Sequence, residues 1–203
     1  MEYLSRPKRL ALSEFGPQNI IYNNGGKFRI SRMQILSEII PHKFFYNPKT
    51  GVVYKDEENT THHTDIITGE SLDGVAKLIP GMCIEAQDMV AAETEKITCQ
   101  EEERSRKYYQ TKTYFASDDP RSISECELKS PHGEHLANIR YIPSCRLTYI
   151  LESRNDSNGN GFAFDTKTGD WISNGSLARI QAEADKNPEE ADRTKFVKLF
   201  AET

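Results

Sequence analysis

Apolar and polar residues alternate over short stretches along most of this chain, with the period of a β-strand rather than that of a helix. The clearest of these stretches are NIIY, KFRISRMQI, HKFFY, GVVYK, YQTKTYFA, ECELK, ANIRYI and CRLTYILES. Residues 6–40 predict short strands, ALSEF included, with a hairpin turn at Asn23-Asn24-Gly25-Gly26 because Asn and Gly tolerate positive φ. The pattern predicts a mainly β fold of the α+β kind, beginning with a small antiparallel sheet or barrel.

Three five-residue segments of one form, ending in Thr-Gly, lie between strand-like stretches. They are NPKTG (47–51), DIITG (65–69) and DTKTG (165–169). The first lies inside the predicted hairpin HKFFYNPKTGVVYKD, and the third is the tip of the predicted hairpin GFAFDTKTGDWI. A polar residue followed by Thr-Gly is typical of a type I turn with a glycine bulge.

Helical signals are few and lie toward the second half of the chain. Thr98 and Glu101 have the capping-box spacing in ITCQEEERSRKYY, which predicts a short helix near 99–107. Ser176 and Pro188 are expected to begin two further helices, LARIQAEAD and EEADRTKFVKLF. The chain is thus predicted to divide into a small β sheet or barrel with a basic surface (1–42), ribbon-like hairpins (43–80), a second β-rich region (81–175) and C-terminal helices (176–203).

Charge is unevenly distributed along the 203 residues. The net charge is −5, yet residues 1–55 hold nine basic and three acidic residues, so the remainder carries a surplus of eleven negative charges. This asymmetry suggests a local nucleic-acid contact or an acidic partner; the alternative is an ordinary solvated surface. The candidate contacts are Arg6, Lys8, Arg9, Lys27, Arg29 and Arg32. Aromatic residues lie among the basic ones, and proteins often bind single-stranded nucleic acid by stacking bases on aromatic rings and pairing phosphates with Lys or Arg.

The sequence lacks the common catalytic and membrane signatures. It has no P-loop, no G-x-G-x-x-G after a strand, no G-x-S-x-G and no H-E-x-x-H, so neither an enzyme nor a cofactor is expected. No apolar run approaches the roughly 20 residues that span a bilayer, and no signal peptide is present, so a cytoplasmic protein is expected.

Some metal and catalytic alternatives stay open at this point. His62, His63 and Asp65 could ligate a metal, although a polar loop explains them as well. A nuclease would need Mg²⁺-binding carboxylates, for which Asp118, Asp119, Glu125 and Glu127 are candidates by proximity. Glu101-Glu102-Glu103 is explained better by a helix N-terminus than by acid–base catalysis. The four cysteines (Cys83, Cys99, Cys126 and Cys145) form no close pair and are expected to be reduced thiols.

Three segments, taken in order, resemble a region that follows the motor domains of certain bacterial superfamily-two DEAD/DEAH-box helicases. They are RPKRLALSEFGPQNIIYNNGGKFRI, ITCQEEERSRKYYQTKTYF and GFAFDTKTGDWI, within residues 6–173. The family has a zinc-associated C-terminal domain and includes the helicase of the DISARM antiphage system and related DNA-repair helicases. The resemblance implies an accessory region whose ATP hydrolysis lies in a motor domain or subunit elsewhere.

The family's zinc ribbon is degenerate in this chain. Asn47, Thr50, Asp65 and Thr68 stand where the resemblance implies four thiolates, and neutral Asn and Thr are poor zinc ligands. We therefore expect metal-free ribbon-like hairpins whose turns are held by Asx-type hydrogen bonds. The expected function is a non-catalytic helicase module in antiphage defence or DNA repair that contacts single- or double-stranded DNA or docks the motor. The alternative is a protein–protein interaction subunit of a defence complex without nucleic-acid contact.

Overall fold

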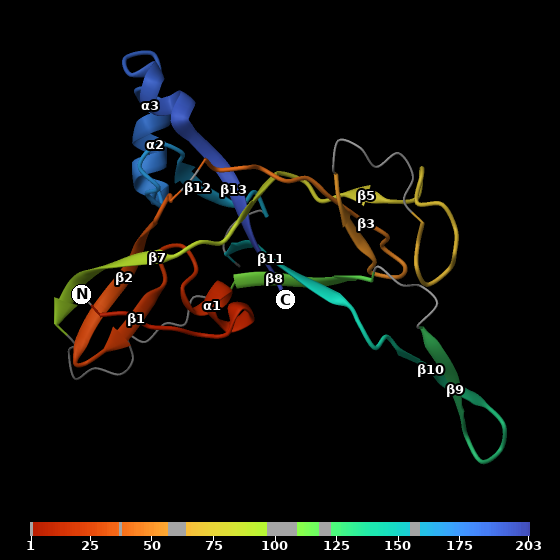
Figure 1. Cartoon of the computed structure of the whole chain (residues 1–203). Coiled ribbons are helices and arrows are strands. Elements are labelled where there is room, and N and C mark those ends of the chain that lie inside the picture. The colour runs from red at the N-terminus through yellow and green to blue at the C-terminus, as the bar shows by residue number, and fades with distance from the viewer. Residues whose placement is uncertain (1, 37, 57–63, 97–108, 118–122, 155–158) are drawn as a thin grey trace. The chain divides into compact units, whose positions relative to one another are not determined.

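The computed structural model describes residues 2–36, 38–56, 64–96, 109–117, 123–154 and 159–203 (Figure 1). The helix predicted near 99–107 lies outside these residues. In chain order the elements are α1 (Lys8–Glu14), β1 (Ile20–Asn23), β2 (Gly26–Met33), β3 (Phe44–Tyr46), β4 (Val53–Lys55), β5 (Lys77–Leu78), β6 (Met82–Glu85), β7 (Met89–Lys96), β8 (Tyr109–Ala116), β9 (Ser124–Lys129), β10 (His135–Tyr141), β11 (Arg146–Arg154), β12 (Phe162–Asp165), α2 (Asn174–Ala182), α3 (Pro188–Arg193) and β13 (Thr194–Glu202). The predicted mainly β fold is confirmed.

The chain forms two compact units. Unit 1 comprises Met1–Lys43, Pro80–Lys112 and Tyr149–Glu202, and unit 2 comprises Phe44–Ile79, Thr113–Thr148 and Thr203. Each unit is assembled from segments that are far apart in the sequence. The division into residues 1–42, 43–80, 81–175 and 176–203 stays a prediction.

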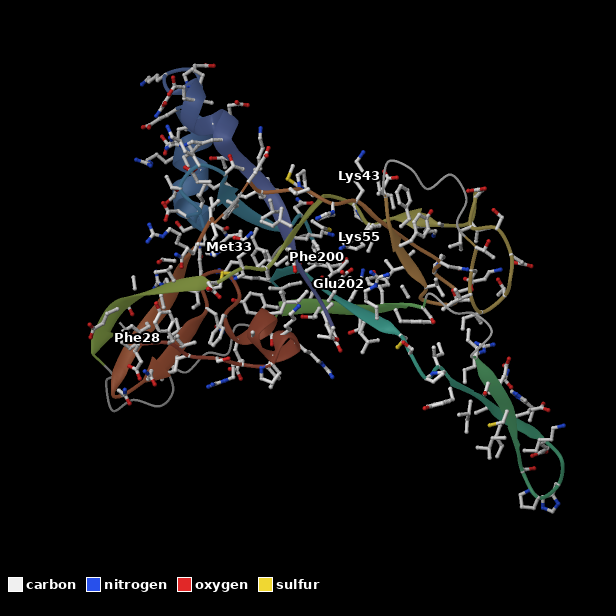
Figure 2. The ribbon with its side chains drawn as sticks, in the orientation of Figure 1. Phe28, Met33, Lys43, Lys55, Phe200 and Glu202 are labelled. Carbon is white, nitrogen blue, oxygen red and sulfur yellow. The ribbon has the colours of Figure 1, made fainter. Side chains whose placement is uncertain are left out.

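Unit 1 contains a three-stranded sheet, β1-β2-β7, and most of a larger sheet built around β13. Asn24 and Gly25, at φ 46° and 78°, make the predicted hairpin turn between β1 and β2. In the larger sheet the order is β12-β13-β11-β8, and β6 pairs in parallel with β13. Phe200, labelled in Figure 2, and Leu199 are buried in β13, so this strand lies at the centre of the core of unit 1.

Two predictions about the ends of the chain are wrong. ALSEF is not a strand: Lys8–Glu14 form helix α1, because Lys, Arg, Leu, Ala and Glu all favour a helix and Gly16-Pro17 follow its end. The C-terminal segment is not helical throughout. Helix α3 ends at Arg193, and the β-branched and aromatic run from Thr194 onward forms β13, whose backbone groups bond to strands on both sides.

Unit 2 contains the three-stranded sheet β4-β3-β5 and the two-stranded hairpin β9–β10. The predicted hairpin around NPKTG is confirmed, since Phe45 of β3 is paired with Tyr54 of β4 and the two rings stack at 5.4 Å. Phe44, Val52, Val53, Leu72 and Ile79 form the buried apolar side of this unit. The small core holds the first two Thr-Gly turns in position.

Candidate functional site

The three Thr-Gly turns have the same backbone geometry. In each, the glycine N–H donates to the carbonyl of the first residue, and the first residue's N–H donates to the carbonyl that follows the glycine. The glycine bonds measure 2.8 Å for Gly51 to Asn47, 2.7 Å for Gly69 to Asp65 and 2.9 Å for Gly169 to Asp165. The glycine φ angles are 79°, 72° and 81°, the left-handed region that a glycine bulge requires.

Asp65 joins the first two turns through its buried carboxylate. Its Oδ1 accepts the backbone N–H groups of its own turn, from Ile67 at 2.8 Å and Thr68 at 3.2 Å. Its Oδ2 accepts from the other turn, from Asn47 Nδ2 at 2.6 Å and Thr50 Oγ1 at 2.5 Å. Asp65 is 0% exposed, so these four bonds replace the water that a carboxylate would otherwise keep.

The hydrogen bonds at Asp65 favour its ionised form. Burial by itself raises the pKa of this carboxyl, but the bonds from Thr50, Ile67, Asn47 and Thr68 together lower its pKa below the ordinary value of 3.8. Asp65 is therefore a carboxylate at neutral pH. A single buried charge holds two turns that are 15 residues or more apart in the chain.

Three of the four positions proposed as former zinc ligands come together at this point. The fourth, Thr68, turns to its own backbone instead, where its Oγ1 accepts from Glu70 N at 3.3 Å. Both oxygens of Asp65 already accept two bonds, and Asn47 and Thr50 are neutral, so this donor set does not fit a zinc ion. The described residues contain no group of three or more His, Cys, Asp or Glu that could hold a metal, and His62 and His63 lie outside them.

In the third turn, 165–169, the carboxylate of Asp165 has no second Thr-Gly turn to bind. Asp165 Oδ1 accepts from Lys167 N at 2.9 Å and Thr168 N at 3.1 Å, as in the second turn. Its Oδ2 instead pairs with Arg193 Nε at 2.7 Å. In both aspartate turns Oδ1 accepts from the turn's own backbone, and Oδ2 contacts residues that are distant in the sequence. These are Asn47 and Thr50 for Asp65, and Arg193 for Asp165.

The six predicted nucleic-acid contacts lie on two elements of unit 1. Arg6, Lys8 and Arg9 lie at or just before α1, and all three contact the protein itself. Arg6 Nε is 2.9 Å from Glu14 Oε2, and Lys8 Nζ donates to the carbonyl of Glu202 at 3.0 Å. The Arg9 guanidinium lies 5.8 Å from the Tyr149 ring centroid. Because exposed pairs of this kind contribute little, they restrain these side chains only weakly.

The β1–β2 hairpin carries basic and aromatic residues on one face. Tyr22 is the register partner of Lys27, and Ile20 is that of Arg29, so these four residues share a face. Tyr22 is 39% exposed and Arg29 is exposed. Lys27 is half-buried, so Tyr22 and Arg29 are the more exposed members of this face.

The other face of the hairpin belongs to the core of unit 1. Phe28, labelled in Figure 2, is the register partner of Ile21, and Ile30 on the same side is buried. Arg32 lies beyond an irregularity in the β2–β7 register and forms an isolated bridge with Asp170. The structure therefore groups Lys27 and Arg29 with Tyr22, and places Arg32 beside an acidic residue.

A buried charged group was missed in the sequence. Lys198 is 3% exposed inside β13, and its Nζ is 3.5 Å from Glu152 Oε1, while Lys112 Nζ is 2.9 Å from Glu152 Oε2. The neighbouring Cys83 is fully buried, and burial raises the pKa of its thiol to about 11. The positive charge of Lys198 lowers this pKa, and the negative charge of Glu152 raises it. A neutral thiol is a weak nucleophile, which argues against a catalytic role for Cys83. The sequence could have indicated this buried charge, because Lys198 is a single lysine within the apolar run FVKLF.

The carboxylates considered for a nuclease do not form a cluster among the described residues. Glu125 pairs with Arg140 at 3.1 Å, and Glu127 pairs with Lys129 at 2.9 Å, both on the β9–β10 hairpin. Asp118 and Asp119 lie outside the described residues, as do Glu101-Glu102-Glu103 and Cys99. Cys126 and Cys145 are exposed free thiols.

Comparisons with known proteins give no match to this chain, whether against family models, curated proteins or solved structures. Within the described residues, no helix combines the length and the apolar character needed to cross a membrane.

Proposed function

We propose that this protein is a non-catalytic accessory module of a DNA helicase, acting in the cytoplasm in antiphage defence or DNA repair. The module contacts DNA, in single-stranded form, through the β1–β2 hairpin, and it works beside a motor domain or subunit that hydrolyses ATP. The observation that carries the DNA contact is the exposed face on which Tyr22 lies beside Lys27 and Arg29. Rings that stack on bases and cations that bind phosphates are the two components of single-strand recognition.

The helicase part of the proposal is supported by the resemblance together with the two joined turns. Three of the four positions that the resemblance assigns to a zinc ribbon meet at Asp65, although their residues are not zinc ligands. Two hairpin turns facing each other across a short distance are the geometry of a ribbon knuckle pair. A hydrogen-bonded carboxylate in place of the metal is compatible with descent from such a ribbon.

Replacing Lys27 and Arg29 together by alanine is expected to weaken binding of a fluorescein-labelled single-stranded oligonucleotide. Each phosphate contact to a single strand contributes about 0.7 to the slope of log affinity against log salt, so the double variant should lose roughly 1.4 from that slope. Tyr22→Ala should weaken binding as well, by about 1–3 kcal/mol if its ring stacks on a base. Fluorescence anisotropy over a series of salt concentrations measures both effects.

The matched control removes two exposed lysines outside the hairpin, Lys43 and Lys77. It changes the net charge by the same amount, so it should leave the salt slope near the wild-type value. If the wild-type protein fails to bind at low salt, or if the control loses as much affinity as the hairpin variant, the DNA contact proposed here is wrong.

A second candidate function is favoured by the β9–β10 hairpin. Leu128, Ile139 and Tyr141 lie on one face of this two-stranded ribbon, and they are 48%, 51% and 65% exposed. Its other face carries the Glu125–Arg140 ion pair. A hairpin alone is marginally stable in water, and exposed apolar faces mark protein contacts. Absence of DNA binding, together with a partner that stays bound after nuclease treatment, would favour an interaction subunit.

A further inference from the structure

Unit 1 contains a hollow of about 250 Å³ that the sequence did not reveal. Its lining residues come from the loop between α1 and β1, the end of β11, the segment around β12, the start of α2 and β13. The residues that line it include Gln18, Arg154, Asn160, Trp171, Asn174 and Phe196. None of these belongs to the exposed face of the β1–β2 hairpin or to the Asp65 cluster.

The lining has a distinct chemistry. Of the described residues that line the hollow, Arg154 is the only charged one. Gln18, Asn160 and Asn174 add carboxamides, each of which offers both donors and acceptors. A ligand that suits this lining carries negative charge and has an edge with donors and acceptors.

The position of Arg154 is fixed by Gln18. Arg154 Nη2 donates to Gln18 Oε1 and to the carbonyl of Pro17, both at 2.9 Å. Gln18 Nε2 in turn donates to the carbonyl of Trp171 at 3.3 Å. Gln18 has φ 61°, a left-handed conformation that favours glycine, and such strain collects at binding sites. The guanidinium is therefore held at the wall before any ligand arrives.

Three aromatic residues line the hollow, namely Phe162, Trp171 and Phe196. Trp171 is 6% exposed, and its indole Nε1 is buried with no hydrogen-bond partner among the described residues. A buried N–H donor without a partner is uncommon in a folded protein, so the indole is a polar group that the fold leaves unsatisfied beside the hollow. Phe196 also lines the hollow but is 43% exposed, so its ring is accessible to a planar group.

We propose that this hollow receives one unpaired nucleotide of a bound single strand. The base stacks on Phe196 and bonds through its edge to the carboxamides, and the phosphate binds Arg154. A planar ring, a donor–acceptor edge and a negative charge occur together in a nucleotide, and each meets its complement in the lining. This inference rests on the proposed DNA contact, but it concerns residues outside the hairpin.

Trp171 is the only tryptophan of the chain, so its fluorescence reports on the hollow directly. The four deoxynucleoside 5′-monophosphates are titrated separately, with N-acetyl-tryptophanamide correcting for absorbed light. Saturable quenching is expected, and Phe196→Ala should weaken the affinity about tenfold by removing the stacking ring. Asn174→Ala, an exposed position, is a second variant that should weaken it if Phe196→Ala disturbs the fold.

Nucleosides and inorganic phosphate serve as the other arms of the titration. Saturation by phosphate with an affinity equal to that of the nucleotides would overturn the proposal and make the hollow an anion site. Absence of saturable quenching by any mononucleotide would also overturn it, while hairpin-dependent binding of an oligonucleotide would leave the proposed function intact. Lys77→Ala, an exposed position outside both the hairpin and the hollow, should leave mononucleotide binding unchanged. Mononucleotide binding without oligonucleotide binding would contradict the proposed function and would show that the hollow takes free nucleotides and not a nucleotide of a strand.

Discussion

Replacing Asp65 by asparagine is expected to destabilise unit 2 by about 3 kcal/mol, because buried hydrogen bonds to a charged group each contribute about 1.5–3 kcal/mol. The amide removes the charge and puts an NH₂ donor where one oxygen accepted. That donor faces Asn47 Nδ2 and Thr50 Oγ1, or the N–H groups of Ile67 and Thr68. At least two of these donors then lack a buried acceptor.

Hydrogen exchange of the β3 and β4 amides measures this loss locally. Exchange through opening of the unit should accelerate about a hundredfold for a loss of about 3 kcal/mol. Thr68→Ala is the matched control in the same turn, since its hydroxyl only accepts a bond from Glu70 N at 3.3 Å. Equal exchange rates in the Asp65→Asn variant and the wild type would show that the carboxylate does not hold the turns together.

The same cluster gives unit 2 a dependence on pH. Because the folded-state pKa of Asp65 is lowered from 3.8, its contribution to stability is present above that value and is lost as the pH falls through the folded pKa. The Asp65→Asn variant should therefore lack this part of the acid sensitivity. Its stability should converge toward that of the wild type as the pH is lowered.

Replacing Glu152 by glutamine is expected to destabilise unit 1 by about 3–5 kcal/mol, the cost of leaving one partner of a buried ion pair without the other. Lys198 is 3% exposed, and Glu152 is its counter-charge at 3.5 Å. Lys112 loses a partner too, but its side chain is 55% exposed, so water can replace that contact. The unpaired charge on Lys198 is the main source of the loss.

A second substitution separates this explanation from a simple packing defect. Lys198→Met in the Glu152→Gln background should recover most of the stability, because the methionine fills a similar volume without a charge. Chemical denaturation of the wild type, the two single variants and the double variant gives the coupling between the sites. If the double variant is no more stable than Glu152→Gln, the buried charge is not the cause.

The sequence predicted those parts of the fold that local chemistry determines. The three Thr-Gly turns and the hairpins around them depend on residues within about five positions of one another, and they were predicted from glycine and Asx preferences alone. The turn between β1 and β2 followed from Asn24 and Gly25 in the same way. Helix α2 was predicted, but its start was not placed correctly: Ser173 caps the helix, and Ser176 lies inside it. The ends of a helix are harder to predict from sequence than its presence.

The parts that were missed depend on contacts between distant segments. Thr194–Glu202 is a strand because β6, β11 and β12 supply hydrogen-bond partners from elsewhere in the chain. The hollow depends on Gln18 and Arg154, which lie 136 residues apart. The resemblance assigned Asn47, Thr50, Asp65 and Thr68 to former ligand positions. That Asp65 is the acceptor for both turns depends on contacts between distant residues and could only be observed in three dimensions.

A carboxylate, and not a metal ion, joins the two ribbon-like turns. Elemental analysis of the purified chain, combined with thermal unfolding with and without a chelator, tests the claim most directly. We predict no stoichiometric zinc and an unfolding temperature that the chelator leaves unchanged. One zinc per chain, with a lower unfolding temperature after chelation, would contradict it and direct attention to Asp65 together with His62 and His63.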